Sequence, residues 1–202
     1  MGVESLAGGF AMRRLIAGFK MSVDGKIEGP QGFADWVDAW SEDYGLTQQI
    51  DACILGGQMY PGYEGYWTAI QQSQGQPLPM TGKRVTAAEE EWARFAARTP
   101  HYVLSTTLPA YQWSNTTILQ SVEEIAALKQ GPGKDIYLMG GARTAASLMD
   151  AGLVDELRLL VYPLVAGPGK ALFSTTQQRS TLDLRHVERR DGGLLSLTYT
   201  KA

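Results

Sequence analysis

Residues 135–161 read DIYLMGGARTAASLMDAGLVDELRLLV, and this stretch decides the fold class. Its predicted elements are, in order, a strand over Asp135–Met139, a turn at Gly140–Gly141, a helix over Arg143–Ala151, a cap at Gly152 and a strand over Leu157–Val161. The pattern is a strand, a helix that ends on glycine, and a second strand. A unit of this length is typical of two parallel strands in one sheet, joined by a crossover helix.

The rest of the chain continues this alternation. Short apolar runs predict further strands over Leu15–Phe19, Ala52–Leu55, Tyr102–Leu104 and Thr117–Leu119. Helical patterns cover Asp35–Ile50, Thr86–Arg98 and the segment that opens at Ser121, and Gln71–Lys83 is typical of a surface loop. Thr181–Arg190 and Leu194–Thr200, joined by Asp191-Gly192-Gly193, predict a terminal hairpin. We therefore predict one α/β domain with a mixed sheet over residues 13–202, after a flexible tail at residues 1–12.

Composition argues against several classes of protein. The chain has 202 residues, of which 44% are hydrophobic and 19% charged, and this composition is globular rather than disordered. The net charge of −3 disfavours a broad nucleic-acid or acidic-membrane surface, and no apolar run approaches the ~20 residues that span a bilayer. Cys53 is the single cysteine and there are two histidines, so we expect no disulfide, no metal site and a buried strand cysteine. We expect a cytoplasmic protein whose partner is a small molecule.

Two glycine pairs, Gly56–Gly57 and Gly140–Gly141, follow predicted strands. Ligands of open α/β sheets bind at the carboxyl ends of strands, and the start of a helix offers free N–H groups to phosphate. Gly140–Gly141 before a helix therefore fits a pyrophosphate site, although a tight turn explains it equally well and the G-x-G-x-x-G spacing is missing. The hydroxyls of residues 105–107 could bind phosphate or ribose, or could form a solvated strand end.

Asp24 and Asp35 are the carboxylates nearest the first strand, and either could donate a proton or orient a substrate amide. Asp24 precedes a glycine and could instead form a turn, whereas Asp35 could cap a helix. The aromatic set Trp36, Trp40 and Tyr44 is more typical of a core than of a site.

Several segments, taken in order, resemble a known family. They are residues 21–27 (MSVDGKI), 51–60 (DACILGGQMY), 103–105 (VLS), 136–141 (IYLMGG), 151–157 (AGLVDEL) and 163–173 (PLVAGPGKALF). Their order and spacing resemble the riboflavin-biosynthesis reductase domain, known as the RibD C-terminal domain, within the dihydrofolate-reductase-like family. The resemblance covers nearly all of the chain after the tail. No deaminase motif is present, so we expect at most the reductase half, and residues 32–67 look closer to stand-alone members of the family.

The resemblance implies a three-layer fold with a mostly parallel sheet of about eight strands and an antiparallel strand at the carboxyl end. It implies a homodimeric oxidoreductase that transfers hydride from NADPH to a heterocyclic or ribosylamino-pyrimidine substrate. It places the cofactor at Phe19 and Ile27 (nicotinamide), Gly56, Gln58 and Met59 (adenosine), Ser105 and Thr106 (ribose or 2′-phosphate) and Met139, Gly140, Gly141 and Ala142 (pyrophosphate). It places the catalytic carboxylate at Asp35, with Asp24 as the alternative.

The chain departs from the family at two arginines. Gly57-Gln58-Met59 stands where the family has Arg-x-Thr, and Thr106 stands where an arginine often follows the strand serine. Because arginine binds phosphate with paired charged donors, NADH becomes a possible cofactor beside NADPH unless Lys83, Arg84 or Arg143 substitutes. Two other functions stay open: a dihydrofolate reductase, and a nucleotide-binding member of the fold without catalysis.

Overall fold

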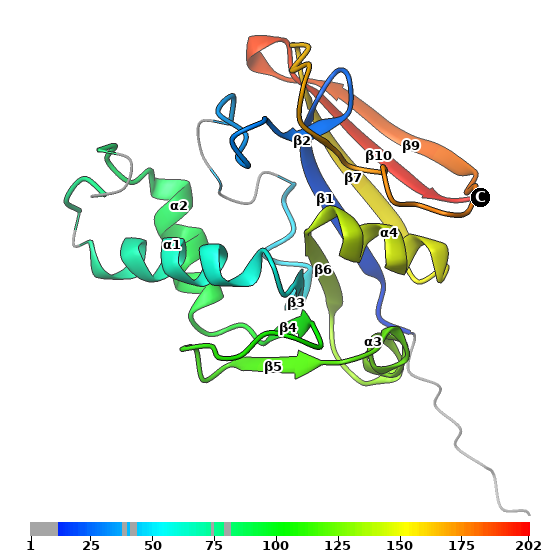
Figure 1. Ribbon diagram of the computed structural model, residues 1–202, viewed down its shortest axis with the longest axis horizontal. Coiled ribbons are helices and arrows are strands. Elements are labelled where there is room, and N and C mark those ends of the chain that lie inside the picture. The colour runs from blue at the N-terminus through cyan, green and yellow to red at the C-terminus, as the bar shows by residue number, and fades with distance from the viewer. Residues whose placement is uncertain (1–11, 38–39, 41–43, 74, 79–81) are drawn as a thin grey trace, which may run out of the picture.

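The computed structural model describes residues 12–37, 40, 44–73, 75–78 and 82–202. One eight-stranded sheet with the order β5-β4-β3-β6-β1-β7-β10-β9 runs through the molecule (Figure 1). The strands are β1 (Leu15–Ser22), β3 (Ile50–Gly56), β4 (His101–Leu104), β5 (Thr116–Leu119), β6 (Asp135–Gly140), β7 (Glu156–Tyr162), β9 (Leu182–Arg189) and β10 (Leu195–Lys201). Neighbours from β5 to β7 are parallel, and β10 is antiparallel to β7 and β9. The predicted fold class is confirmed.

Helices cover both faces of this sheet and complete three layers. The helices are α1 (Tyr60–Gln72), α2 (Ala87–Ala96), α3 (Val122–Gln130) and α4 (Ala142–Asp150). Ile16 packs in one core cluster with Trp67 of α1 and Trp92 of α2, whereas Leu15 packs in the other with Leu148 of α4. Successive side chains of a strand point to opposite faces, so β1 contributes to both cores. None of the helices in the described residues has the length and apolar character needed to cross a membrane.

Two smaller elements complete the chain. β2 (Lys26–Glu28) and β8 (Lys170–Ala171) form a short antiparallel ribbon. A 3-10 turn, η1 (Asp191–Gly193), joins β9 to β10, as the hairpin pattern predicts.

Local signals explain where the helices start and stop. Thr86 Oγ1 accepts the N–H of Glu89 at 3.2 Å and Glu89 Oε2 accepts the N–H of Thr86 at 2.9 Å, so the predicted capping box opens α2. Ser121 caps α3 in the predicted place. The chain leaves α4 through Gly152, which has a φ of +67°, a conformation that favours glycine.

The predicted helix over Asp35–Ile50 is wrong in the residues that the structure describes. Residues 35–37 and 44–49 are turns, bends and coil, Ile50 belongs to β3, and residues 38–39 and 41–43 lie outside the described residues. Gly45 has a φ of +70°, which interrupts a helix at that point. Of the aromatic residues at near-helical spacing, Trp40 and Tyr44 instead line a cavity.

The segment after β3 also differs from the prediction. Residues 60–72 form α1, a helix that the sequence analysis does not assign, and the predicted loop Gln71–Lys83 therefore begins after Gln72. Leu78 within that loop is buried rather than on the surface. Cys53 is fully buried in β3, as predicted.

Candidate functional site: a cavity at the carboxyl ends of the parallel strands

A cavity of about 1180 Å³ lies at the carboxyl ends of β3, β4 and β6 and beside β1. This is the edge at which open α/β sheets bind ligands. Ligand pockets for a single drug-sized molecule are commonly about 300–1,000 Å³, so this cavity has room for a cofactor and a substrate together.

Every predicted cofactor-binding residue lines this one cavity. They are Phe19, Ile27, Gly56, Gln58, Met59, Ser105, Thr106, Met139, Gly140, Gly141 and Ala142. Asp35 lines it as well, but Asp24 and Lys26 do not. The structure therefore brings together residues that lie more than 120 positions apart in sequence.

The turn from β6 into α4 requires glycine. Gly140 has a φ of +147° and Gly141 a φ of +43°, and a Cβ on Gly140 would lie 2.9 Å from Met59 Sδ. No side chain caps the start of α4. Its first N–H groups therefore face the cavity without an internal acceptor, which is the arrangement that binds phosphate.

The turn from β3 into α1 has the same character. Met59 occupies the cap position without a side-chain hydrogen bond, and a proline stands in the first turn. A Cβ on Gly56 would overlap Thr144 Oγ1 of α4, so the end of β3 lies against the first turn of α4. In contrast, α2 and α3 are capped by threonine and serine. Both uncapped helices begin at the cavity, which the capped start of α2 at Thr86 also lines.

The loop after β4 closes this side of the cavity. Ser105 Oγ accepts the N–H groups of Thr107 at 3.2 Å and of Leu108 at 3.0 Å. A Cβ on Gly57 would overlap Ser105 Oγ, so this loop touches the β3–α1 turn. Thr106 and Thr107 are exposed and line the cavity. We call the described residues 56–59 and 104–107 the adenosine end, after the group that we propose for it below.

The opposite side of the cavity is aromatic. Its side chains include Phe33, Val37, Trp40, Tyr44, Tyr63, Tyr66, Leu78, Trp92 and Tyr137, which we call the aromatic end. A Cβ on Gly18 of β1 would lie 2.8 Å from the Tyr137 hydroxyl, so the missing side chain lets aromatic rings lie over β1. Tyr44 belongs to the core, as expected, and also lines the cavity. The core interpretation is wrong for Trp40, which is 42% exposed and lines the cavity, whereas Trp36 does not line it.

A buried carboxylate holds the aromatic end together. Glu89 is 5% exposed, and its carboxylate accepts bonds from Tyr66 Oη at 2.7 Å and from the Thr86 N–H and hydroxyl, each at 2.9 Å. Burial alone raises the pKa of Glu89, but hydrogen bonds from Thr86, Tyr66 and the Trp40 backbone outweigh it and lower the pKa. Glu89 is therefore an anion that ties α2 to α1 and to Trp40. No sequence signal beyond its capping role points to it.

The cavity is lined by several cations, and Lys20 lies at the aromatic end. Lys20 Nζ lies 6.0 Å from the ring centroid of Trp40. Lys170 pairs with Glu28 at 2.6 Å. Lys83 and Arg84 come just before Thr86, and Arg143 is in the first turn of α4.

Asp24 has a structural role outside the cavity. It accepts hydrogen bonds from Ser22 Oγ at 2.6 Å and from the N–H groups of Ala166 at 2.9 Å and Gly167 at 3.0 Å. These bonds, with that from Ser22 the largest, lower the pKa of Asp24 to about 2. Asp24 thus fixes the β1–β2 turn to the loop after β7. Asp35 is exposed and lines the cavity, so the geometry favours it over Asp24.

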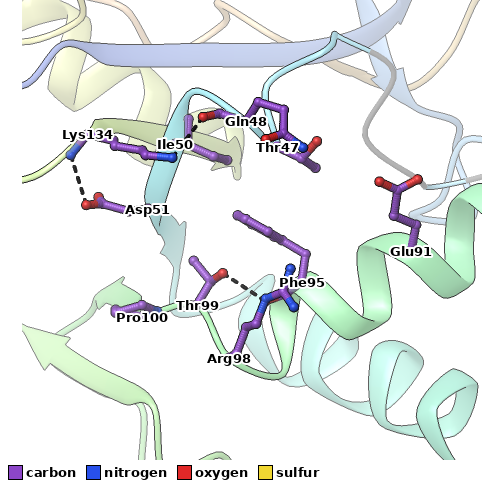
Figure 2. A pocket seen from close by; sticks show the side chains of 10 residues that line it. All are labelled: Thr47, Gln48, Ile50, Asp51, Glu91, Phe95, Arg98, Thr99, Pro100 and Lys134. Carbon is purple, nitrogen blue, oxygen red and sulfur yellow. Dashed lines mark hydrogen bonds between the residues drawn. The ribbon is translucent and has the colours of Figure 1, made fainter.

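A smaller cavity of about 410 Å³ lies at the opposite edge, where the parallel strands begin (Figure 2). Its polar groups bond one another: Asp51 accepts the N–H of Lys134 at 2.9 Å, and Lys134 Nζ donates to the Gln48 carbonyl at 3.0 Å. These contacts join the starts of β3 and β6 and do not converge on a ligand. Within the described residues, no group of three histidine, cysteine, aspartate or glutamate side chains could share a metal ion.

The fold and the cavity define the class of protein: a three-layer α/β protein with the strand order of a doubly wound sheet and a ligand cavity at its carboxyl edge. The chain belongs to the RibD C-terminal domain family, whose model matches residues 13–196. It is 32% identical over 191 residues to the uncharacterized protein YyaP of Bacillus subtilis (strain 168), covering 93% of this chain and 94% of YyaP.

Solved structures share the fold. A putative riboflavin biosynthesis protein from Shewanella sp. PV-4 superposes with a TM-score of 0.67 at 19% identity, covering 94% of this chain and 99% of that one. A dihydrofolate reductase from Enterococcus faecalis, complexed with NADP(H), superposes with a TM-score of 0.58 at 18% identity, covering 93% and 96%. The dihydrofolate-reductase-like architecture is therefore shown.

Proposed function

We propose that the protein is an oxidoreductase that transfers hydride from a nicotinamide nucleotide to a heterocyclic or ribosylamino-pyrimidine substrate. One observation carries the proposal: two uncapped helix starts and an aromatic end share a single cavity. The helix starts suit the pyrophosphate of a dinucleotide, and the aromatic end suits flat rings. Membership of the RibD C-terminal domain family supports the same activity.

The residues of the cavity fit a nicotinamide dinucleotide. The glycine turn before α4 leaves open the space that a Cβ would fill, and the first N–H groups of α4 and α1 would bind the two phosphates. A Cβ on Gly140 would lie 3.7 Å from the ring of Phe19, so Phe19 and Ile27 would flank the nicotinamide beside this turn. When bound there, the reduced nicotinamide would supply the hydride.

The aromatic end would hold the substrate ring against the nicotinamide. Trp40, Tyr44 and Tyr137 supply flat apolar surface and exclude water, and the Lys20 ammonium above Trp40 would attract an anionic substituent. Glu28 is paired with Lys170, and Glu89 is bonded by Tyr66 and Thr86. Among the described residues, Asp35 is therefore the cavity carboxylate best placed to orient the ring or donate a proton.

Two titrations test the proposal. NADH and NADPH are each added to the wild-type protein and to Gly141→Asp, which places an anion at the pyrophosphate turn, and binding is followed by nicotinamide fluorescence and thermal shift. The proposal expects saturable binding of one or both nucleotides and its loss in the variant. If neither nucleotide binds the wild-type protein at millimolar concentration, the cofactor assignment is wrong.

Turnover then separates the proposed reductase from its alternatives. A phosphoribosylamino-pyrimidinone, as in riboflavin synthesis, and dihydrofolate are offered with the preferred nucleotide, and absorbance at the nicotinamide band is followed. Oxidation with dihydrofolate alone would identify a folate reductase. Tight nucleotide binding without turnover of any heterocycle in a panel would identify a non-catalytic nucleotide-binding protein.

A further inference from the structure

The order of the strands decides which end of the cavity takes the adenosine. Sheet order β4-β3-β6-β1 puts the glycine turn after β6 between the turns that follow β3 and β4 and strand β1, over which Tyr44 and Tyr137 of the aromatic end lie. A pyrophosphate at this turn has one nucleoside on each side of it. The nicotinamide must meet the substrate ring, and the aromatic end supplies the flat apolar side chains that suit both rings. The adenosine ribose therefore lies against residues 56–59 and 104–107, the end named for it above.

The adenosine end presents side-chain hydroxyls and one side-chain amide to the ribose, but no positive charge. All of its residues are described, and they include Gln58, Ser105, Thr106 and Thr107 but neither lysine nor arginine. Ser105 Oγ already accepts two backbone N–H groups, so it has only its own proton to give.

Five lysine and arginine side chains of the described residues line the cavity, and all of them lie outside the adenosine end. Lys20 lies over Trp40, and Lys170 pairs with Glu28 beside β2. Lys83 and Arg84 lie just before Thr86, the residue that caps α2 and bonds Glu89. Because Glu89 also accepts a hydrogen bond from the Trp40 backbone, this segment lies at the aromatic end. Arg143 stands in the first turn of α4, where it would face the two negative charges of the proposed pyrophosphate.

The contact between Gly57 and Ser105 keeps position 57 without a side chain. A Cβ on Gly57 would overlap both Oγ and Cβ of Ser105. Rotation of the serine does not relieve the overlap with its Cβ, and it would break the bonds to Thr107 and Leu108. No cation can therefore enter the adenosine end from position 57 while the two loops keep this contact.

We infer that the adenosine end selects NADH over NADPH. The inference rests on the proposed function and specifies its cofactor. A ribose 2′-phosphate carries close to two negative charges at neutral pH, and proteins bind such a group with arginine or lysine. At the adenosine end, this dianion would lose its bound water and meet only hydroxyls and one amide, without a counter-ion. The ribose 2′-hydroxyl of NADH would replace its hydrogen bonds to water by hydrogen bonds to these groups, at little cost in free energy.

The test compares dissociation constants of NADH and NADPH for the wild-type protein and for a pair of variants with long side chains that differ in charge. Thr106→Arg adds a cation to the adenosine end, and Thr106→Gln adds a long neutral side chain at the same place. We expect the wild-type protein to bind NADH at least about tenfold more tightly than NADPH. We expect Thr106→Arg to shift the ratio of the two constants several-fold toward NADPH, and Thr106→Gln to leave the ratio near the wild-type value.

Arg143→Ala separates the two phosphate sites. An arginine that serves the pyrophosphate lowers affinity for both nucleotides by the same factor when it is removed, and this is the expected result. A loss confined to NADPH would place the 2′-phosphate at Arg143 and overturn the inference.

Three further results would overturn it. NADPH that binds as tightly as NADH, or more tightly, defeats the selectivity while leaving the proposed function intact. A wild-type preference for NADH that Thr106→Arg does not change shows that the adenosine lies elsewhere. If neither nucleotide binds, the proposed function is wrong, and the inferred selectivity is wrong as well.

Discussion

Tyr66 of α1 donates its hydroxyl proton to Glu89 of α2 across 2.7 Å, and this bond joins the two helices beneath the aromatic end. The carboxylate also accepts the N–H and hydroxyl of Thr86. Because Glu89 is buried, it needs all of these donors to remain an anion. The same side chain therefore starts a helix, packs two helices together and shapes the cavity.

Removing this carboxylate should weaken the fold and change its acid response. Hydrogen bonds lower the pKa of Glu89 below its unfolded value of 4.5, so its stabilisation is complete above that pH and is lost as the pH falls through the folded pKa. We expect Glu89→Gln to cost about 1–3 kcal/mol of unfolding free energy at pH 7, and less at pH 3. Tyr66→Phe keeps the charge and should cost about 1 kcal/mol.

Urea unfolding of the wild-type protein and both variants at pH 7, 4.5 and 3 measures these differences. If Glu89→Gln costs the same at every pH, then the charge of Glu89 does not stabilise the fold.

His101 should act in a different pH range. His101 is the first residue of β4, and its Nε2 lies 3.0 Å from the Tyr63 hydroxyl. Burial lowers the pKa of His101 from 6.5 to about 4. The unfolded chain takes up the proton more readily, so stability is full above pH 6.5 and falls as the pH drops toward 4. A difference of this size corresponds to about 3 kcal/mol.

The matched variant is His101→Gln, which keeps a polar partner for Tyr63 but cannot titrate. Unfolding free energies at pH 7, 6, 5 and 4 should fall less steeply for this variant than for the wild-type protein. Equal slopes would show that His101 does not titrate in this range.

Local sequence signals predict those parts of the fold that are built locally. Residues 135–161 combine an apolar strand, two glycines and a capped helix, and the observed β6, α4 and β7 follow the prediction within a few residues. The two glycine turns of the cavity are predictable for the same reason, and they suit the cofactor that we propose because close approach to phosphate requires a missing side chain. These features depend on neighbours in sequence and not on distant packing.

The rest of the fold and of the candidate site depends on contacts between segments that are distant in sequence. The choice between Asp24 and Asp35 rests on Ala166 and Gly167, which bond Asp24 from 142 and 143 positions away. Glu89 and Tyr66 meet only because α1 packs on α2, and α1 itself is not assigned from the sequence. Its signal was present, since the buried residues Tyr60, Tyr63, Trp67 and Ile70 recur at helical spacing.

Asp35→Asn and Asp24→Asn form a matched pair that separates catalysis from structure. Asp35 lines the cavity, and we expect its amide variant to lower kcat by about 10²–10⁴ while nucleotide binding stays near the wild-type value. Asp24 lies outside the cavity and accepts three hydrogen bonds, so its variant should lower the melting temperature and leave kcat nearly unchanged.

Steady-state kinetics with the substrate found in the turnover panel, together with thermal denaturation, measure both effects. The reverse pattern, with kcat lost only in Asp24→Asn, would contradict the placement of the catalytic carboxylate.

Gly140→Ala should damage both the fold and the site. The added Cβ lies 2.9 Å from Met59 Sδ, and a φ of +147° strains any residue except glycine. We expect a loss of about 1–3 kcal/mol of stability and weaker nucleotide binding. Gly65→Ala is the control, because its Cβ meets no atom within 4 Å on the exposed side of α1, and it should stabilise the helix by up to about 1 kcal/mol.

Chemical unfolding and nucleotide titration of the two variants test this contrast. Equal stabilities and affinities for Gly140→Ala and the wild-type protein would show that the turn does not need glycine.

We predict that two chains associate through the edge strand β9. All of its residues from Asp183 to Arg189 are exposed, and among them Leu184 and Val187 are apolar and more than half exposed. Both pair with residues of one face of β10, Leu184 with Tyr199 and Val187 with Leu197, so they form one apolar strip. Folded proteins usually cover such an edge, and a homodimer through β9 would do so.

Sedimentation velocity should therefore give a species of twice the 22.0 kDa chain mass. The double variant Leu184→Lys with Val187→Lys puts like charges on the strip and should sediment as a monomer, with its helix content unchanged by circular dichroism. Val165→Lys changes an exposed valine of the loop after β7 and should leave the dimer intact. A wild-type protein that sediments at 22.0 kDa at micromolar concentration would contradict the dimer, whereas a dimer that persists in the double variant would place the interface on another surface.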